Sequence, residues 1–183
     1  MTWSGPSTPW WIPTGRHSDA WPDAWPDLPS ALDEVRESFG EERISMVAVD
    51  EDGAALGWIG GISEYDGNVW ELHPLVVHTE RQGEGIGRAL VADLEERLRE
   101  RGALTVMLGS DDVSNQTTLS GVDLYDDLSG KMANIRNLRR HPYEFYQKLG
   151  YKIVGVVPDA NGVGKPDIIM AKRIGGTEPR QEL

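Results

Sequence analysis

The clearest hydrophobic pattern in the sequence lies between residues 86 and 100. Five apolar residues recur at helical spacing and predict one buried helix face: Ile86, Leu90, Val91, Leu94 and Leu98. Four charged residues are expected largely outside that face: Glu95, Glu96, Arg99 and Glu100. Gly102 is expected to end the helix, because glycine readily adopts the left-handed conformation that follows a helix.

Shorter apolar runs on both sides of this helix predict strands. They are Ile44–Val49, Ala55–Ile62, Trp70–Val77, Leu104–Leu108, Tyr151–Val157 and Asp167–Ile174. Further helices are expected over Ser30–Phe39, Ser129–Leu138 and Pro142–Leu149. Pro74 interrupts the third strand and removes a backbone donor there, which predicts a bulge or a splay. The order of elements predicts a mixed α/β or α+β fold built on one sheet.

Composition narrows the possible partners. The chain has 183 residues, 30 of them acidic and 18 basic, which gives a formal net charge of −12. This charge argues against binding to nucleic acid or to an anionic membrane and favours cationic small molecules or simple solubility. Cysteine is absent, which excludes disulfides and thiolate catalysis and fits a cytoplasmic protein. No apolar run approaches the ~20 residues of a membrane span, and no signal peptide is recognisable at the start.

The first 30 residues have an unusual composition. They hold five of the seven tryptophans and six of the eleven prolines, and Ala-Trp-Pro-Asp occurs twice between Ala20 and Asp27. Tryptophan is costly to leave in water, so this segment predicts an ordered wrap; a partly disordered leader is the alternative for residues 1–15. The expected organisation is an extension over residues 1–20, one domain over 21–174 and a tail over 175–183.

A glycine-rich loop precedes the predicted central helix. It reads Gln82-Gly83-Glu84-Gly85-Ile86-Gly87-Arg88. Missing side chains let backbone N–H groups converge at a helix N-terminus, where an anion such as phosphate binds favourably. The spacing fits neither a P-loop nor a dinucleotide fingerprint. A purely structural turn is the alternative.

The surrounding residues carry a family resemblance. Gln82-x-x-Gly85-x-Gly87, after the strand Leu75–Val77, resembles motif A of the GCN5-related N-acetyltransferases, and Phe145-Tyr146-x-x-x-Gly150-Tyr151 resembles their motif B. Further strings resemble aminoglycoside 6′-N-acetyltransferases of the chromosomal enterococcal type: residues 70–77, 108–112, 117–120, 141–146 and 150–170. The resemblance covers roughly residues 21–174 and implies the fold of that superfamily, with splayed central strands. It also implies acetyl-CoA as cosubstrate, bound by Leu75, Val76, Val77, Gln82, Gly83, Glu84, Gly85, Ile86, Gly87, Arg88 and Tyr146.

The chemistry of acetyl transfer to an amine suggests roles for three residues. Glu71 is the candidate base, although it could equally anchor the cationic substrate; strand alternation places it on one face with His73. The resemblance implies that the backbone N–H of Leu75 polarises the acetyl carbonyl. It also places Tyr146 near the coenzyme sulfur, where it could protonate the thiolate or only pack.

The substrate site is expected to be acidic and aromatic. Its candidates are Trp21, Asp23, Tyr65, Glu71, His73, Asp111 and Asp112. For Asp111 and Asp112 the alternative is a turn or a helix cap. His73 and His78 lie five residues apart on opposite strand faces, so no metal site is expected, and His141 is expected to cap or pack.

Three functions therefore compete. The leading one is an aminoglycoside 6′-N-acetyltransferase of the antibiotic-resistance type, expected to be a cytoplasmic homodimer. The second is an acetyltransferase of the same superfamily for another amine, either a polyamine or a peptide N-terminus. The third is a module that binds acyl-CoA without turnover, against which the presence of both Glu71 and Tyr146 argues.

Overall fold

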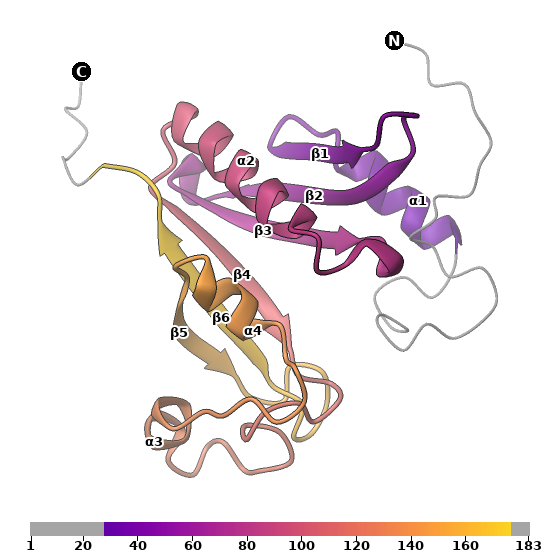
Figure 1. The fold of residues 1–183 in the computed structure, drawn as a ribbon. Helices are drawn as coiled ribbons and strands as arrows, with labels where there is room; N and C mark the ends of the chain where they lie inside the picture. Colours follow the sequence, from indigo (N-terminus) through magenta and orange to yellow (C-terminus); the bar gives the residue numbers. More distant parts are fainter. Residues whose placement is uncertain (1–27, 177–183) are drawn as a thin grey trace, which may run out of the picture. The chain divides into compact units, whose positions relative to one another are not determined.

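The structure is a computed structural model that describes residues 28–176. Trp21, Asp23 and the expected wrap lie outside the described residues. The elements run α1 (Leu28–Glu37), β1 (Arg43–Val49), β2 (Ala55–Glu64), β3 (Val69–Val77), α2 (Ile86–Glu100), β4 (Thr105–Asp111), α3 (Leu128–Ala133), α4 (Tyr143–Lys148), β5 (Lys152–Val157) and β6 (Asp167–Arg173) (Figure 1). Two short 3₁₀ turns, η1 (Tyr65–Gly67) and η2 (Thr79–Arg81), flank β3.

The six strands follow the order β1-β2-β3-β4-β6-β5. The β1–β2, β4–β6 and β5–β6 pairs are antiparallel, and the β3–β4 pair is parallel. This mixed sheet with helices confirms the predicted fold class. The residues form two compact units, and β3 contributes to both: Glu64–Glu71 belongs with the chain from Leu98 onward, and Leu72–Arg97 belongs with α1, β1 and β2.

In the first unit, the core lies between α2 and the strands. Figure 1 shows α2 running over β2 and β3, and Leu90, Val91 and Leu94 are at most 6% exposed. Burying each such side chain stabilises the fold by ~1.5–3 kcal/mol. Glu95 is 4% exposed, which corrects its expected placement outside the apolar face: it lies four residues after Val91, on the same side of the helix.

Polar contacts near the end of α1 also stabilise the first unit. The Trp58 indole N–H donates to the Ser45 hydroxyl over 2.8 Å, and the Ser38 hydroxyl lies 3.1 Å from the same oxygen. Trp58 is 2% exposed, so its N–H requires a partner, and Ser45 provides one. The contact joins the end of α1 to β1 and β2.

In the second unit, one face of β4 and β6 forms the core. Val106, Leu108, Ile168 and Met170 are at most 1% exposed, and α4 packs on β6 (Figure 1). Residues at alternate positions of the same strands are less buried. One face of this part of the sheet is therefore buried, and the opposite face is more exposed.

Several predicted boundaries change. The helix α1 begins at Leu28 rather than Ser30, and α3 ends at Ala133 rather than Leu138. The strand β4 continues through Gly109 and Ser110 to Asp111, because β6 pairs with it along its whole length. Asp111 therefore lies in a strand rather than after one.

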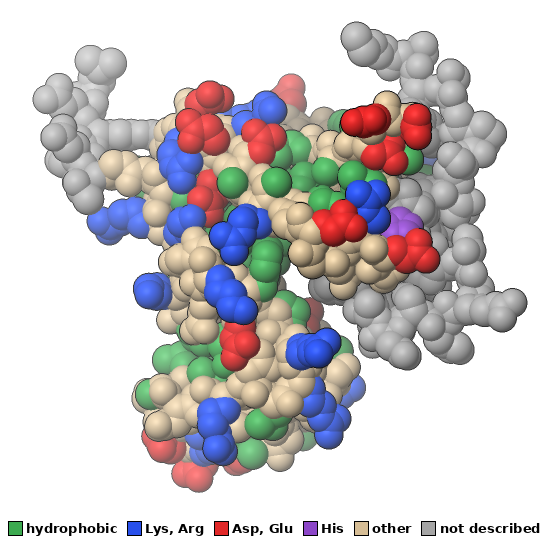
Figure 2. All heavy atoms as spheres, viewed as in Figure 1, with side chains coloured by type: hydrophobic (Ala, Val, Ile, Leu, Met, Phe, Trp, Pro, Cys, Tyr) green, Lys and Arg blue, Asp and Glu red, His purple; other side chains and the backbone are tan. Residues whose placement is uncertain are grey.

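The excess of acidic residues does not form one field on the face drawn in Figure 2. Acidic and basic side chains are interspersed there. No helix within residues 28–176 combines the length and apolarity that crossing a membrane would need.

Candidate functional site: a glycine loop and an acidic sheet face

The glycine loop leads directly into α2. Gly83 and Gly85 have φ angles of +85° and +91°, a region that favours glycine. The first helical hydrogen bond here runs from the Ala89 N–H to the Gly85 carbonyl over 3.0 Å. The backbone N–H groups of residues 86–88 precede this bond and are the first-turn donors of a 15-residue helix. This geometry suits an anion such as a pyrophosphate, so the loop residues fit a coenzyme with phosphate groups.

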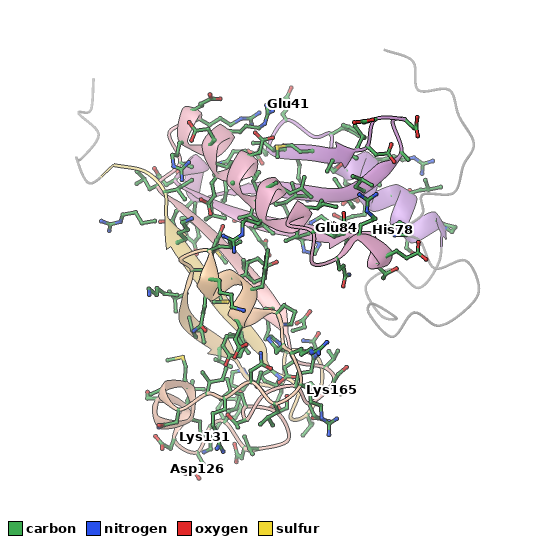
Figure 3. All side chains as sticks on the ribbon, viewed as in Figure 1. Glu41, His78, Glu84, Asp126, Lys131 and Lys165 are labelled. Atoms are coloured by element: carbon green, nitrogen blue, oxygen red, sulfur yellow. The ribbon has the colours of Figure 1, made fainter. Side chains whose placement is uncertain are left out.

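Side chains within the loop hold its shape. Arg81 Nη2 and Glu84 Oε2 form an ion pair over 2.9 Å, and Gln82 Nε2 donates to the Val77 carbonyl over 3.3 Å. The hydrogen bond from Arg81 lowers the pKa of the Glu84 carboxyl. Figure 3 labels Glu84 on this loop and His78 at its start, where His78 Nδ1 accepts from the Glu80 N–H. Glu84 is therefore part of the loop's framework, and the backbone is the part suited to a phosphate.

The strand β3 alternates as expected. Trp70, Leu72, Pro74 and Val76 are buried, whereas Glu71, His73 and Leu75 are less so. The register between β3 and β4 runs from Val69 and Thr105 to Glu71 and Met107, and so ends before Pro74. The His73–Pro74 peptide bond is cis.

Two glycines in β2 allow close approach of β3, and sequence reasoning missed both. A β-carbon at Gly60 would overlap the His73 carbonyl. One at Gly57 would lie 2.9 Å from the Val76 carbonyl oxygen and 3.0 Å from Leu90 Cδ1. Glycine within an otherwise apolar strand pattern is the signal that could have identified them.

The less buried side of the second unit's sheet gathers carboxylates from three strands. In the register, Asp111 of β4 pairs with Asp167 of β6, and Glu71 of β3 pairs with Met107 of β4. Paired residues, and residues two apart on one strand, point to the same face. Glu71, Asp111 and Asp167 therefore share one face. Gly109 lies on the same face of β4, between Met107 and Asp111. Sequence reasoning identified the first two and missed Asp167.

The Asp167 carboxylate lies over the backbone of Gly109, where a β-carbon would overlap its oxygens. Oδ1 is buried, and the described residues offer it no hydrogen-bond partner. Burial, the charge of Asp111 and the charge of Glu71 raise the pKa of this carboxyl to about 6, although backbone N–H groups of Ser110 and Ile168 oppose the rise. In contrast, Asp111 Oδ1 accepts a hydrogen bond from Asn161 Nδ2.

The carboxylate of Asp112 is buried and bonded to the loop that follows β4. The residue is 0% exposed, and its carboxylate accepts from the Gln116 N–H over 2.6 Å and from the Thr117 N–H over 2.8 Å. Burial raises the pKa of this carboxyl, but hydrogen bonds from Ser120, Gln116 and Thr117 outweigh burial, and the pKa lies below its ordinary value. The geometry matches the turn-capping alternative and does not support the expectation that Asp112 holds a substrate ammonium.

His141 supports the same segment. It is 2% exposed, its Nδ1 accepts from the Tyr143 N–H, and its Nε2 lies 3.1 Å from the Asp111 carbonyl oxygen. Because Nδ1 accepts, Nε2 carries the proton and donates to that carbonyl. Burial lowers the pKa of His141, which favours this neutral form. The expectation that His141 caps or packs is confirmed.

The aromatic candidates differ in exposure. Tyr146 on α4 is 9% exposed and meets Phe145 and Tyr151 edge to face, with ring centroids 5.0 and 5.7 Å away. Burial raises the pKa of its phenol above the ordinary value, so the hydroxyl keeps its proton. Tyr65 in η1 is 72% exposed and can offer a ring face to a ligand.

Within residues 28–176, no group of three or more His, Asp or Glu side chains is arranged to hold a metal ion.

Comparison with known proteins supplies a family match and several close structures. The model of the acetyltransferase (GNAT) family matches residues 11–126. An aminoglycoside 6′-N-acetyltransferase from Enterococcus faecium is 51% identical, with 88% of this chain and 87% of that chain covered and a TM-score of 0.79. An aminoglycoside 6′-N-acetyltransferase complexed with coenzyme A is 49% identical, with 90% of each chain covered and a TM-score of 0.80. A search of curated proteins found no match.

Proposed function

Because the chain belongs to the GNAT acetyltransferase family, we propose that it is an aminoglycoside 6′-N-acetyltransferase. It would transfer the acetyl group of acetyl-CoA to the 6′-amino group of an aminoglycoside antibiotic and thereby cause resistance. One observation carries the proposal: two solved enzymes with that printed activity share 51% and 49% of their residues with this chain over about nine-tenths of its length.

The coenzyme is assigned to the loop and to β3. Acetyl-CoA supplies the acetyl group as a thioester. Backbone N–H groups at the start of α2 would hold its pyrophosphate, and the backbone of Leu75, Val76 and Val77 would align its pantetheine arm. The N–H of Leu75 would donate to the carbonyl oxygen on which negative charge develops.

The amine is assigned to the acidic face. An alkylammonium has no lone pair, so a base must take its proton before attack. Glu71 would either accept this proton or anchor the ammonium. Tyr146 has its proton available for the departing thiolate, or serves only to pack against the coenzyme. Tyr65 and His73 would contact the sugar rings, and Trp21 and Asp23 stay as predicted substrate residues.

One assay distinguishes an aminoglycoside substrate from the two rival amines. Thiol release from acetyl-CoA is measured with kanamycin B, with spermine and with a peptide that has a free N-terminus. We expect release with kanamycin B and product mass increased by one acetyl group at the 6′ nitrogen. Faster release with spermine or the peptide would favour the second reading, and acetyl-CoA binding without release for any amine would favour the non-catalytic module.

We also infer that the enzyme is a homodimer in the cytoplasm. The resemblance to the enterococcal enzymes supports the dimer, with residues 109–140 and the C-terminal strands as its candidate interface. Light scattering at micromolar concentration tests it: a mass near 20.3 kDa would contradict the dimer, and a mass near twice that value would support it.

A further inference from the structure

The Asp167 carboxylate packs against the backbone of the neighbouring strand. Its residue pairs with Asp111 in the register, yet its side chain lies over Gly109 of the neighbouring strand. Any other residue at 109 would place a β-carbon in the space that the carboxylate occupies. The absence of a side chain at Gly109 therefore leaves room for the Asp167 carboxylate at this point.

The environment of this carboxylate lacks a compensating charge. Oδ1 is buried without a hydrogen-bond partner among the described residues. Backbone N–H groups of Ser110 and Ile168 stabilise the carboxylate, but the charged groups that act on it are Asp111 from β4 and Glu71 from β3, both negative. A buried acceptor without a partner destabilises the folded state, and neighbouring like charges add to that cost. A cation donor placed on this face would satisfy the oxygen and offset the repulsion of all three carboxylates.

We propose that Asp167 is a further substrate-binding residue, which together with Glu71 holds the ammonium group that is to be acetylated. This inference rests on the proposed function, because it takes the amine substrate from there. Three features of the structure support the assignment: the register that places both carboxylates on one face, the glycine under Asp167, and the buried Oδ1 without a partner among the described residues. An ammonium has three N–H donors, enough to bind both side chains at once.

Other carboxylates near this face do not have the same features. Asp111 is exposed and already accepts from Asn161, and Asp112 is buried but bonded to its own loop. Among Asp111, Asp112 and Asp167, it is Asp167 that has a buried carboxylate oxygen left for a ligand donor to bond.

The test compares Asp167→Asn and Asp167→Ser with Asp52→Asn in the full-length protein. Asp52 is exposed in the β1–β2 turn, so its substitution removes the same charge away from the acidic face. Kanamycin B and kanamycin C are the probes, since they differ in carrying an amine or a hydroxyl at the 6′ position. Affinities are measured by calorimetry, and steady-state kinetics give KM and kcat with kanamycin B.

Both Asp167 variants should bind kanamycin B about tenfold or more weakly than the wild type, as expected for loss of a charge-assisted contact. Their affinity for kanamycin C should change by less than about threefold, and KM for acetyl-CoA should stay constant. Asp52→Asn should match the wild type throughout. An equal loss for both antibiotics, or no loss for kanamycin B, would overturn the assignment.

The two levels of the proposal fail in different ways. If the wild type acetylates no aminoglycoside, the proposed function is wrong. If the wild type is active and the Asp167 variants keep its KM for kanamycin B, the function stands and the role of Asp167 is refuted. Since the substitution removes a partly buried charge that lies beside two other carboxylates, both variants are expected to fold, and circular dichroism checks this.

Discussion

The carboxylate of Asp167 and the α-carbon of Gly109 form a matched pair, because the side chain of one occupies the space that the other leaves empty. The pair links a backbone requirement in β4 to a charge on β6. It also means that the glycine at 109 has a steric role rather than a conformational one.

Gly109→Ala should displace the Asp167 carboxylate. The added β-carbon would lie 3.0 Å from Oδ1 and closer still to Oδ2, and a short side chain can move only by rotating away. We expect a rise in KM for the amine comparable to that of Asp167→Asn. The double variant should be no worse than either single variant, because both changes act on the same contact. Additive losses in steady-state kinetics would contradict this account.

Asp167→Asn should stabilise the protein at neutral pH. The folded-state pKa of Asp167 is raised from 3.8 to about 6, so the penalty on the wild type is absent below about pH 4, grows as the pH rises through this range and is complete above about pH 6. After allowance for solvent screening, the gain should be about 1–2 kcal/mol at pH 7 and should vanish near pH 4. Urea unfolding at both pH values measures it; equal stability of the two proteins at pH 7 would exclude the penalty.

Gly85→Ala should weaken acetyl-CoA binding more than it destabilises the fold. Its φ of +91° is unfavourable for alanine, and the cost is ~1–2 kcal/mol. Gly53→Ala is the matched control, because Gly53 has φ +82° in the β1–β2 turn and, like Gly85, has no neighbour within 4 Å of an added β-carbon. Calorimetry with coenzyme A should show weaker binding for the first variant only. Equal affinities would remove the loop from the coenzyme site.

Asp112→Asn should destabilise the fold more than Asp111→Asn does. Asp112 is buried and accepts two backbone N–H groups, so its substitution should cost about 1.5–3 kcal/mol. Because its pKa lies below the ordinary value, this contribution is present at neutral pH and is lost as the pH falls below about 4. Asp111→Asn should leave the unfolding free energy within about 0.5 kcal/mol of the wild type. The opposite ranking in urea unfolding would contradict the assignment.

Tyr146→Phe separates proton donation from packing. The ring contacts with Phe145 and Tyr151 are kept, and only the hydroxyl is lost. A general acid contributes ~10²–10⁴-fold, so a fall in kcat of that size with unchanged coenzyme affinity would support proton donation. A fall below about threefold would assign Tyr146 to packing. Because burial raises the pKa of the Tyr146 phenol, the pH dependence of kcat near neutral pH should be the same for the wild type and for Tyr146→Phe.

The elements were predictable from local pattern where one period dominates. The face of α2 and the alternation of β3 follow from residues such as Leu94 and Trp70, whose burial is set by spacing. The end of β4 was not predictable, because Gly109 and Asp111 disfavour strands by propensity and are held there by pairing with β6. Tertiary pairing overrode the local preference.

The site was predictable only in part, for a related reason. Glu71 and Asp111 lie within recognisable strings, and the strand of Glu71 could be assigned. Asp167 begins a strand 56 residues after Asp111, and nothing in their local sequences indicates that the two pair. Asp112 shows the converse: its type suggested a ligand for a cation, but the direction of its side chain depends on a loop that reaches as far as Thr117.

Adjacent positions 111 and 112 consequently differ in how freely selection can change them. The loop that follows β4 depends on the carboxylate of Asp112, so most replacements there should be eliminated along with the folded protein. Asp111 is exposed, and replacing it leaves the bonds of Asp112 to Gln116 and Thr117 in place. Substitutions that leave the protein folded are therefore expected to accumulate at 111 rather than at 112.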